Sequence, residues 1–161
     1  MENNKVVLAD GTTLIDLTDS TVTPETLLDG VVAYNAKGER IVGTMALPQM
    51  QTQGNWQYKV YDDGTFEAWY SATGQTLVIT AQSGNLYRSE LQTLTLPTNM
   101  TAGKTVTIKH AQPNVAHNNY PVFGMLASIQ TNAFKYYAMS GGSRSTSPNY
   151  IVTAYVQGLI S

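Results

Sequence analysis

Residues 56–71, WQYKVYDDGTFEAWYS, constrain the fold of this chain more than any other stretch, because their pattern predicts a β-hairpin. An Asp-Gly pair between two alternating aromatic runs is a strong local signal for antiparallel strands joined by a tight turn. A two-residue loop at Asp63-Gly64 would pair Val60 with Glu67 and would mix apolar and charged side chains on both faces.

A three-residue loop at residues 62–64, with Gly64 in the left-handed conformation, gives a more consistent register. In this register one face of the hairpin is wholly apolar. On the opposite face Lys59 lies across from Glu67, a cross-strand pair that contributes about 0.2–1 kcal/mol. Because a shift of one residue would turn every side chain to the opposite face, the sequence predicts the three-residue loop. The apolar face then holds three cross-strand pairs: Val60–Phe66, Tyr58–Ala68 and Trp56–Tyr70.

The composition indicates an all-β protein of one domain, or one domain with a small appendage. The chain has 161 residues, of which 42% are hydrophobic and only 12% are charged, about half the usual charged share. Thr, Asn, Ser and Gly supply the polar balance, and these residues favour strands and turns. The net charge of -2 leaves no basic stripe for phosphate groups, so no nucleic-acid partner is expected.

The chain contains no cysteine, which excludes disulfides, thiolate catalysis and cysteine-based zinc sites. The first residues, MENNKVVLADG, lack the apolar core and basic flank of a signal peptide. No apolar run reaches the roughly 18 residues of a membrane span, so no membrane insertion is expected. These features together favour assembly in a reducing cytosol.

Residues 1–45 are expected to form a small module of two hairpins and one short helix. Thr23 is the expected N-cap and Pro24 the first residue of a helix over residues 24–28, which Gly30 ends. So short a segment seldom buries enough apolar surface to fold alone. We therefore expect other copies of itself or a docking partner to stabilise it; packing on the larger domain is the alternative. The expected strands cover residues 6–8, 12–15, 31–34 and 40–44.

Residues 46–55, ALPQMQTQGN, are Gln-rich and without periodicity, and they predict a linker. Residues 56–161 then show strand after strand, which predicts a C-terminal antiparallel β-sandwich. Residues 140–149, SGGSRSTSPN, predict a mobile loop between the last two strands. Beyond the hairpin, strands are expected at residues 75–81, 91–96, 104–109, 121–130, 134–139 and 150–158.

Three of these expected strands, at residues 121–130, 134–139 and 150–158, are apolar on both faces. An antiparallel strand with one wet face alternates, so a strand that is apolar on both sides has to be covered twice. About 105 residues cannot supply two covering layers from one chain. We therefore expect copies of the chain to cover one another in an oligomer.

No metal, cofactor or catalytic residue is expected. His110 and His117 have no nearby carboxylate to complete a metal-ligand set and are expected to be structural or solvated. Asp62 and Asp63 build the turn and Glu67 faces Lys59, which disfavours the paired carboxylates of a glycosidase. The nucleophile, zinc and phosphate-loop motifs of common enzymes are missing. A glycosidase acting through Glu67 or Glu90 is the enzymatic alternative.

Aromatic side chains are the more informative candidates for binding. The chain uses ten Tyr against three Phe, and a Tyr ring with its polar tip suits a half-wet surface. Tyr61 and Trp69 fall on the polar face of the hairpin, where they could stack on sugar rings, anchor a protein interface or face a second sheet. Further candidates for a polar-aromatic surface are Tyr120, Tyr136, Tyr137 and Arg144.

Three stretches in order resemble structural proteins of phages that infect Gram-positive bacteria. Residues 30–45, GVVAYNAKGERIVGTM, resemble a short module that recurs in such proteins. Residues 58–71, YKVYDDGTFEAWYS, resemble a hairpin near the start of many tail-fibre tip domains, and residues 149–160, NYIVTAYVQGLI, are similar to the closing strand of those domains. The three stretches touch about a quarter of the chain.

This resemblance implies a virion appendage protein, assembled in the host cytoplasm and usually homotrimeric. Its N-terminal part would attach to other virion proteins, and its C-terminal β-sandwich would contact the host surface, commonly a cell-wall polysaccharide. The chain lacks the long shaft, collagen-like repeat and coiled coil that such fibres often have. The expected function is thus a non-enzymatic receptor-binding fibre; the alternatives are a capsid or tail decoration protein with a purely structural role, and a free carbohydrate-binding module.

Overall fold

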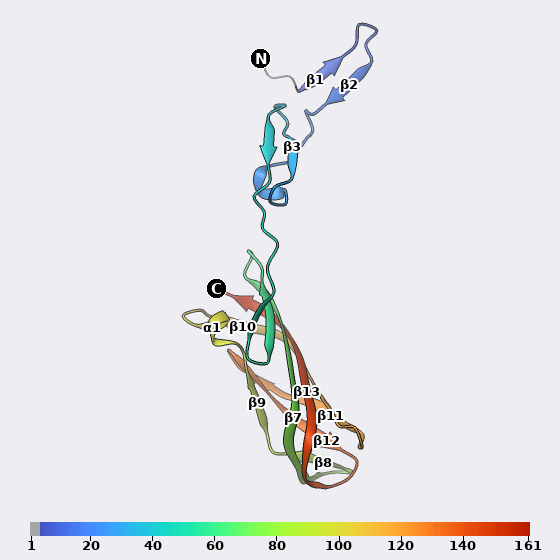
Figure 1. Ribbon diagram of the computed structural model, residues 1–161, viewed down its shortest axis with the longest axis vertical. Helices are drawn as coiled ribbons and strands as arrows, with labels where there is room; N and C mark the ends of the chain where they lie inside the picture. The colour runs from blue at the N-terminus through green and yellow to red at the C-terminus, as the bar shows by residue number, and fades with distance from the viewer. Residues whose placement is uncertain (1–3) are drawn as a thin grey trace. The chain divides into compact units, whose positions relative to one another are not determined.

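The computed structural model describes residues 4–161, except for the side chains of residues 145–148. The chain divides into two compact units, Met1–Leu47 and Pro48–Ser161, which are described separately here. Regular structure in the described residues is almost entirely antiparallel β (Figure 1), so the expected all-β fold is confirmed.

The first unit contains two separate hairpins with a helical turn between them. Both expected hairpins are confirmed, and the expected helix is a single 3-10 turn that begins at Pro24. The elements are β1 (Lys5–Val7), β2 (Thr13–Asp16), η1 (Pro24–Thr26), β3 (Val32–Tyr34) and β4 (Arg40–Val42).

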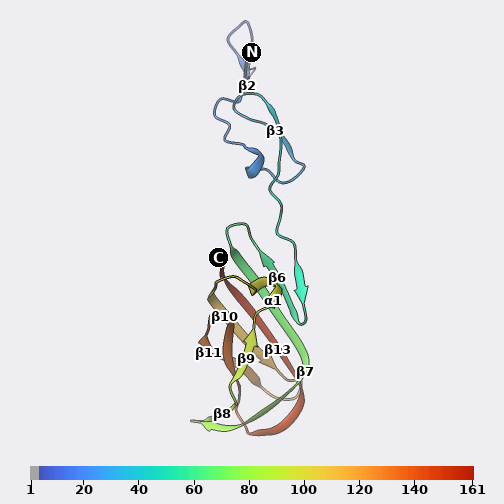
Figure 2. The same cartoon turned by 90° about the vertical axis from the view of Figure 1, so that its left-hand side faces the viewer.

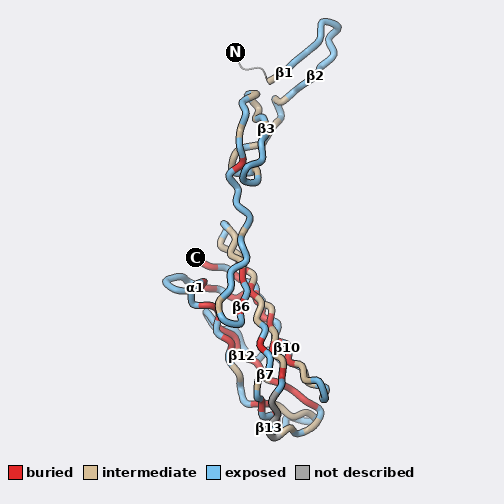
Figure 3. Tube along the Cα trace, viewed as in Figure 1, coloured by how far each residue is buried: buried red, intermediate tan, exposed pale blue. Residues whose placement is uncertain are grey.

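The first unit is held by its backbone and lacks a hydrophobic core. Among described residues 4–47 only Gly43 is buried (Figure 3), while apolar side chains such as Leu14 (58% exposed) and Leu47 (62% exposed) face solvent. A Cβ on Gly43 would collide with the backbone of Leu28, since the two segments cross closely there. The expectation that this segment buries too little surface to stand alone is consistent with this exposure.

The described strands of the second unit form one nine-stranded antiparallel sheet in the order β10-β13-β7-β8-β12-β11, with β6 joining β5 to β7 and β9 pairing with β12. The strands are β5 (Gln51–Gln53), β6 (Trp56–Val60), β7 (Thr65–Ser83), β8 (Leu86–Ser89), β9 (Gln92–Thr95), β10 (Val106–Ala116), β11 (Val122–Ile129), β12 (Ala133–Ser140) and β13 (Arg144–Ile160), and the one described α-helix is α1 (Thr98–Thr101).

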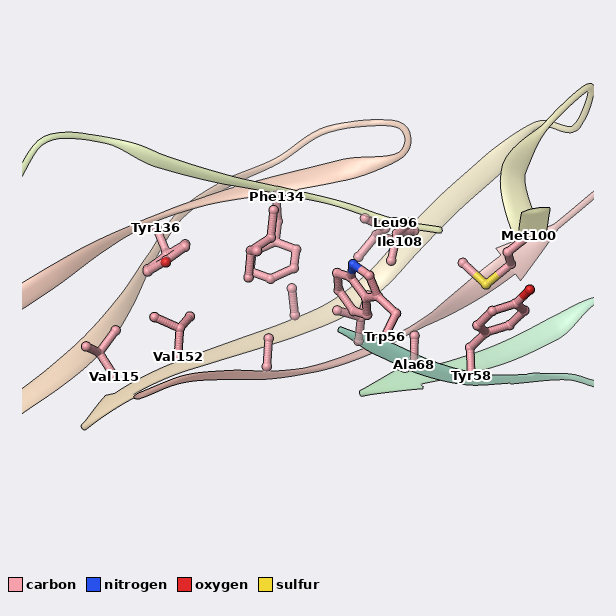
Figure 4. Close-up of a cluster of buried hydrophobic side chains, with 14 of the residues drawn as sticks. Trp56, Tyr58, Ala68, Leu96, Met100, Ile108, Val115, Phe134, Tyr136 and Val152 are labelled. Atoms are coloured by element: carbon pink, nitrogen blue, oxygen red, sulfur yellow. The ribbon is translucent and has the colours of Figure 1, made fainter. Parts of the chain in front are cut away.

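The sheet curls until its two ends approach each other (Figure 2). Gly124 on β11 lies so close to β10 that an added Cβ would be 2.8 Å from the Pro113 carbonyl oxygen. The two facing layers of the expected sandwich are therefore two parts of one curled sheet. Figure 4 shows Phe134 and Tyr136 of one layer packed toward Ala68 and Val152 of the other.

The predicted hairpin register is confirmed at every pair. Strand β6 pairs with β7 through Trp56–Tyr70, Tyr58–Ala68, Lys59–Glu67 and Val60–Phe66. Gly64 has a φ of +81°, as the three-residue loop requires. Tyr58, Phe66 and Ala68 lie in the core, so the apolar face of this hairpin is the one around which the curled sheet closes.

The structure contains two strands, β5 and β8, that the sequence did not predict. Residues 51–53 of the expected linker form β5, which turns into β6 through the two-residue loop Gly54-Asn55. The same Gly-Asn loop at Gly84-Asn85 makes β8, which was not expected. In each case a Gly with positive φ opens a tight hairpin turn.

The expected mobile loop at residues 140–149 is shorter, since β13 begins at Arg144 and pairs with β7 there. The predicted mobility falls largely on residues 145–148, whose side chains lie outside the description.

Candidate functional site

One row of polar and aromatic side chains crosses the outer face of the sheet on β7, β13 and β10. Trp69 on β7 is directly opposite Tyr155 on β13, and Tyr155 is opposite Gln112 on β10. Asn114 and Thr153 form the next pair of this row. The residues between them, such as Ala68 and Ala154, point into the core, because side chains alternate along a strand.

Trp69 separates two neighbouring hollows on this outer face. Its ring lies 5.8 Å from that of Tyr155, at an angle of 42°. Amides, hydroxyls and aromatic rings predominate in both linings, and neither contains Asp, Glu, Lys or Arg. One hollow, of 440 Å³, is lined by Trp69, Tyr70, Gln112, Asn114, Thr153, Ala154 and Tyr155. The other, of 270 Å³, is lined by Thr52, Gly54, Asn55, Trp56, Gln57, Trp69 and Ser71.

Glu67 holds two tyrosines of the outer face in place. Tyr61 Oη donates to Glu67 Oε2 and Tyr155 Oη donates to Glu67 Oε1, each at 2.8 Å. The hydrogen bonds from Tyr155 and then Tyr61 lower the pKa of Glu67, and the same bonds raise the pKa of both phenols. The carboxylate therefore stays ionised near neutral pH, where it orients Tyr155 beside Trp69.

Lys59 and Glu67 are paired across the strands as predicted. The Glu67 carboxylate, however, accepts its hydrogen bonds from the hydroxyls of Tyr61 and Tyr155. The charge of Lys59 makes only a minor contribution to the lowered pKa of Glu67. Tyr155 was not singled out from the sequence. The signal for it was the alternation of residues 150–158, which puts Thr153 and Tyr155 together on one face.

The structure brings two other sequence candidates, Tyr120 and Arg144, together in a second cluster. The Arg144 guanidinium lies 4.1 Å from the centre of the Tyr120 ring. His117 stacks on Tyr120 with centroids 4.4 Å apart and meets Tyr150 edge-on at 4.8 Å. Arg144 pairs with Ile79 on β7, roughly 30 Å along the strand from Trp69.

The remaining two candidates lie elsewhere. Tyr136 is only 4% exposed, and burial raises its pKa to about 12, so its assignment to a binding surface is wrong. It belongs to the core because it lies on the same face of β12 as the buried Phe134. Tyr137 points to the opposite side, where Arg88 lies 4.7 Å from its ring centre.

In the residues that the structure describes, no group of three or more His, Cys, Asp or Glu side chains is arranged to hold a metal ion. The described helices are also too short and polar for any of them to cross a membrane.

No protein-family model matches this chain, and no curated protein matches it. Among solved structures, the fold is similar to the C-terminal part of the P. aeruginosa R1 pyocin fibre, at 14% identity and a TM-score of 0.42. The match covers 66% of this chain and 27% of the pyocin-fibre chain. So weak a likeness carries no argument about function, and it does not support the expected Gram-positive host.

Proposed function

We propose that this protein is a non-enzymatic fibre or spike of a phage particle and binds a host cell-wall saccharide through the Trp69 face. The observation that carries the proposal is the position of Trp69 between two hollows whose linings lack acidic and basic side chains. A sugar ring has an apolar face that packs on an aromatic ring, and its hydroxyls pair with amides and hydroxyls. Gln112 and Asn114 on one side of Trp69, and Asn55 and Gln57 on the other, are such partners.

The placement on a virion is supported by the resemblance of residues 30–45, 58–71 and 149–160 to phage fibre proteins. It is also supported by the first unit, whose apolar side chains need a partner to cover them. We propose that the chain forms a homotrimer and that its first unit also docks on other particle proteins. In the second unit, Phe123, Met125 and Ile129 on β11 are 41–44% exposed and are candidates for contacts between copies.

Binding of labelled protein to a glycan array and to bacterial cell-wall fractions tests this proposal. Replacing Trp69 with Ala is expected to weaken binding at least about tenfold, since the aromatic ring on which a sugar ring would pack is lost. Tyr137→Ala is the matched control, because Tyr137 is a partly exposed aromatic outside the Trp69 face. Equal binding by wild type and Trp69→Ala would contradict the proposal. Loss of strand content in Trp69→Ala would instead assign Trp69 to the core.

A particle-decoration protein without a receptor is the second candidate, because the uncovered first unit needs a partner whether or not the Trp69 face binds sugar. Immunogold labelling of particles separates the two functions. Labelling at the tail tip supports host adsorption, whereas labelling on the head supports decoration.

A further inference from the structure

Two buried polar atoms in the cluster around Arg144 have no hydrogen-bond partner among the side chains that the structure describes. Tyr150 is 0% exposed, and its hydroxyl is one of these atoms; Arg144 Nε is the other. Buried polar groups are hydrogen-bonded in the great majority of cases, and each exception calls for an explanation such as a bound ion or molecule. Two such atoms in one cluster indicate that the described part of the chain does not complete this site.

Both atoms are hydrogen-bond donors. Arg144 Nε belongs to a guanidinium, which has N–H donors and no acceptor. Burial raises the pKa of Tyr150, and the charge of Arg144 only partly offsets this effect, so the phenol stays protonated at neutral pH. A single partner that meets both of these donors is therefore an acceptor.

The charge of the cluster further narrows the choice of acceptor. Within the described part of the chain, Arg144 forms no ion pair, and its guanidinium rests on the Tyr120 ring instead. A planar guanidinium offers parallel N–H groups that match the two oxygens of a carboxylate or a phosphate. An acceptor that also carries negative charge would satisfy both donors and compensate the cation.

We propose that an oxyanion, the carboxylate or phosphate group of a ligand, binds between the Tyr150 hydroxyl and the Arg144 guanidinium. The ring of His117 supports this site by packing on both Tyr120 and Tyr150. The Arg144 side chain is itself partly exposed, so the site lies at the surface of the second unit. As a receptor subsite for an acidic polymer the site rests on the proposed function, whereas oxyanion binding itself does not.

Side-chain NMR of the full-length protein tests the proposal directly. Inorganic phosphate and acetate are titrated against chloride at constant ionic strength, and the Nε–Hε signals of Arg144 and Arg88 are followed. The expected result is a saturable shift of the Arg144 signal. Arg88 is the internal control, since it also lies over a tyrosine ring.

Variants assign the shift to the proposed donors. Tyr150→Phe keeps the ring and is expected to weaken oxyanion binding about tenfold, the loss typical of one hydrogen bond to a charged group. Arg144→Gln is expected to abolish binding as read from the Tyr150 ring signals, whereas Arg88→Gln leaves it unchanged. The proposal is overturned if the Arg144 signal moves no more than that of Arg88, or if Tyr150→Phe binds the oxyanion with unchanged affinity. An ordered water would then be the partner of the two donors.

Polymers distinguish the sources of the oxyanion. Poly(glycerol phosphate) and polygalacturonate carry phosphate and carboxylate, and neutral dextran is the control. Binding of an acidic polymer that Arg144→Gln loses identifies a receptor subsite, whereas binding of small oxyanions alone identifies a free ion as the ligand. Trp69→Ala keeps the phosphate titration intact, so a failure of saccharide binding at the Trp69 face is separable from a failure of this site.

Discussion

At the scale of single residues, Gly64 shows how backbone geometry and packing act at one position. Its φ is +81°, and an added Cβ would lie 2.5 Å from the Ile160 carbonyl oxygen. Gly64 also contacts the end of β13 through its backbone, since Ile160 N donates to the Gly64 carbonyl oxygen at 2.8 Å. A side chain here would strain the turn and push β13 away from it.

Gly64→Val is therefore expected to lower the free energy of unfolding by about 2–4 kcal/mol, from left-handed strain and steric overlap together. Gly84→Val is the matched control: Gly84 also has a positive φ of +61°, but nothing lies within 4 Å of its added Cβ. It should cost only the strain, about 1–2 kcal/mol. Urea unfolding measures the free energy of unfolding of both variants. Equal destabilisation would show that a side chain at position 64 does not clash with the Ile160 carbonyl.

Glu67 is the residue whose charge is coupled to the outer face. Its folded pKa lies below its ordinary value, so the hydrogen-bonded carboxylate stabilises the fold above about pH 4.3 and loses this effect as the pH falls through the folded pKa. Thermal unfolding of wild type and Glu67→Gln should differ by a constant amount between about pH 5 and 8, and the difference should shrink in acid. Because Glu67 is partly exposed, the effect is small.

The two phenols report the same interaction from the alkaline side. The pKa values of Tyr61 and Tyr155 are raised by Glu67, so stability from these bonds is present below about pH 10 and is lost as the pH rises through the raised values. In Glu67→Gln the ultraviolet titration of these phenols should move to lower pH. An unchanged tyrosine titration would show that Glu67 does not hold them.

At the scale of elements, β5 is tied to α1 by one side chain. The backbone N–H of Asn99 donates to Gln53 Oε1 at 2.9 Å, and Gln53 Nε2 donates to Thr98 Oγ1 at 2.7 Å. Pro97, at the N-cap of α1, makes no side-chain cap. Gln53 thus satisfies a free N–H at the start of this helix from another strand, and the helix in turn places Met100 in the core.

Gln53→Ala is expected to destabilise the protein by about 0.5–2 kcal/mol, the range for loss of a helix N-cap. Gln51→Ala on the same strand should have a smaller effect, because the Gln51 side chain is exposed and lies outside the α1 contact. Chemical unfolding gives the comparison. If the two variants are equally stable, β5 does not depend on its contact with α1.

The elements that the sequence predicted well are those whose signal is local. The hairpin at residues 56–71 carries an aromatic alternation and a turn, so its register follows from the sequence alone. Strands β5 and β8 were missed although Gly54-Asn55 and Gly84-Asn85 are recognised two-residue turns, because the strands beside them are short and polar. The strand signals at residues 65–71 and 75–81 were also separated by Gly74, which β7 passes through.

The candidate site was only half predictable, for a different reason. The hairpin register puts Trp69 and Tyr61 on its outer face, which the sequence predicted. That Tyr155 and Gln112 join Trp69 depends on β13 lying between β7 and β10. Such pairing joins segments far apart in the chain, and no local pattern encodes it. The same applies to Arg144, which begins β13, and Tyr120, which precedes β11.

At the scale of the whole molecule, the two units differ in how they are stabilised. The second unit encloses a core that includes Tyr58, Phe66, Phe134 and Tyr150. The first unit buries no apolar side chain in residues 4–47, and we propose that surfaces outside it supply its hydrophobic stabilisation. Self-association is the simplest source of such surface, because every copy carries the same exposed residues.

Sedimentation equilibrium of the full chain is therefore expected to give three times the chain mass of 17.5 kDa. Its unfolding temperature should rise with protein concentration, because association stabilises the folded state. Residues 48–161 alone should keep their strand content but associate more weakly, since they retain the core and lose the uncovered hairpins. Val7→Ser with Leu14→Ser removes apolar surface from the first hairpin without shortening the chain and should act in the same direction. A full-length protein that stays monomeric at high concentration would show that a different partner covers the first unit, and would remove the physical basis for the homotrimer.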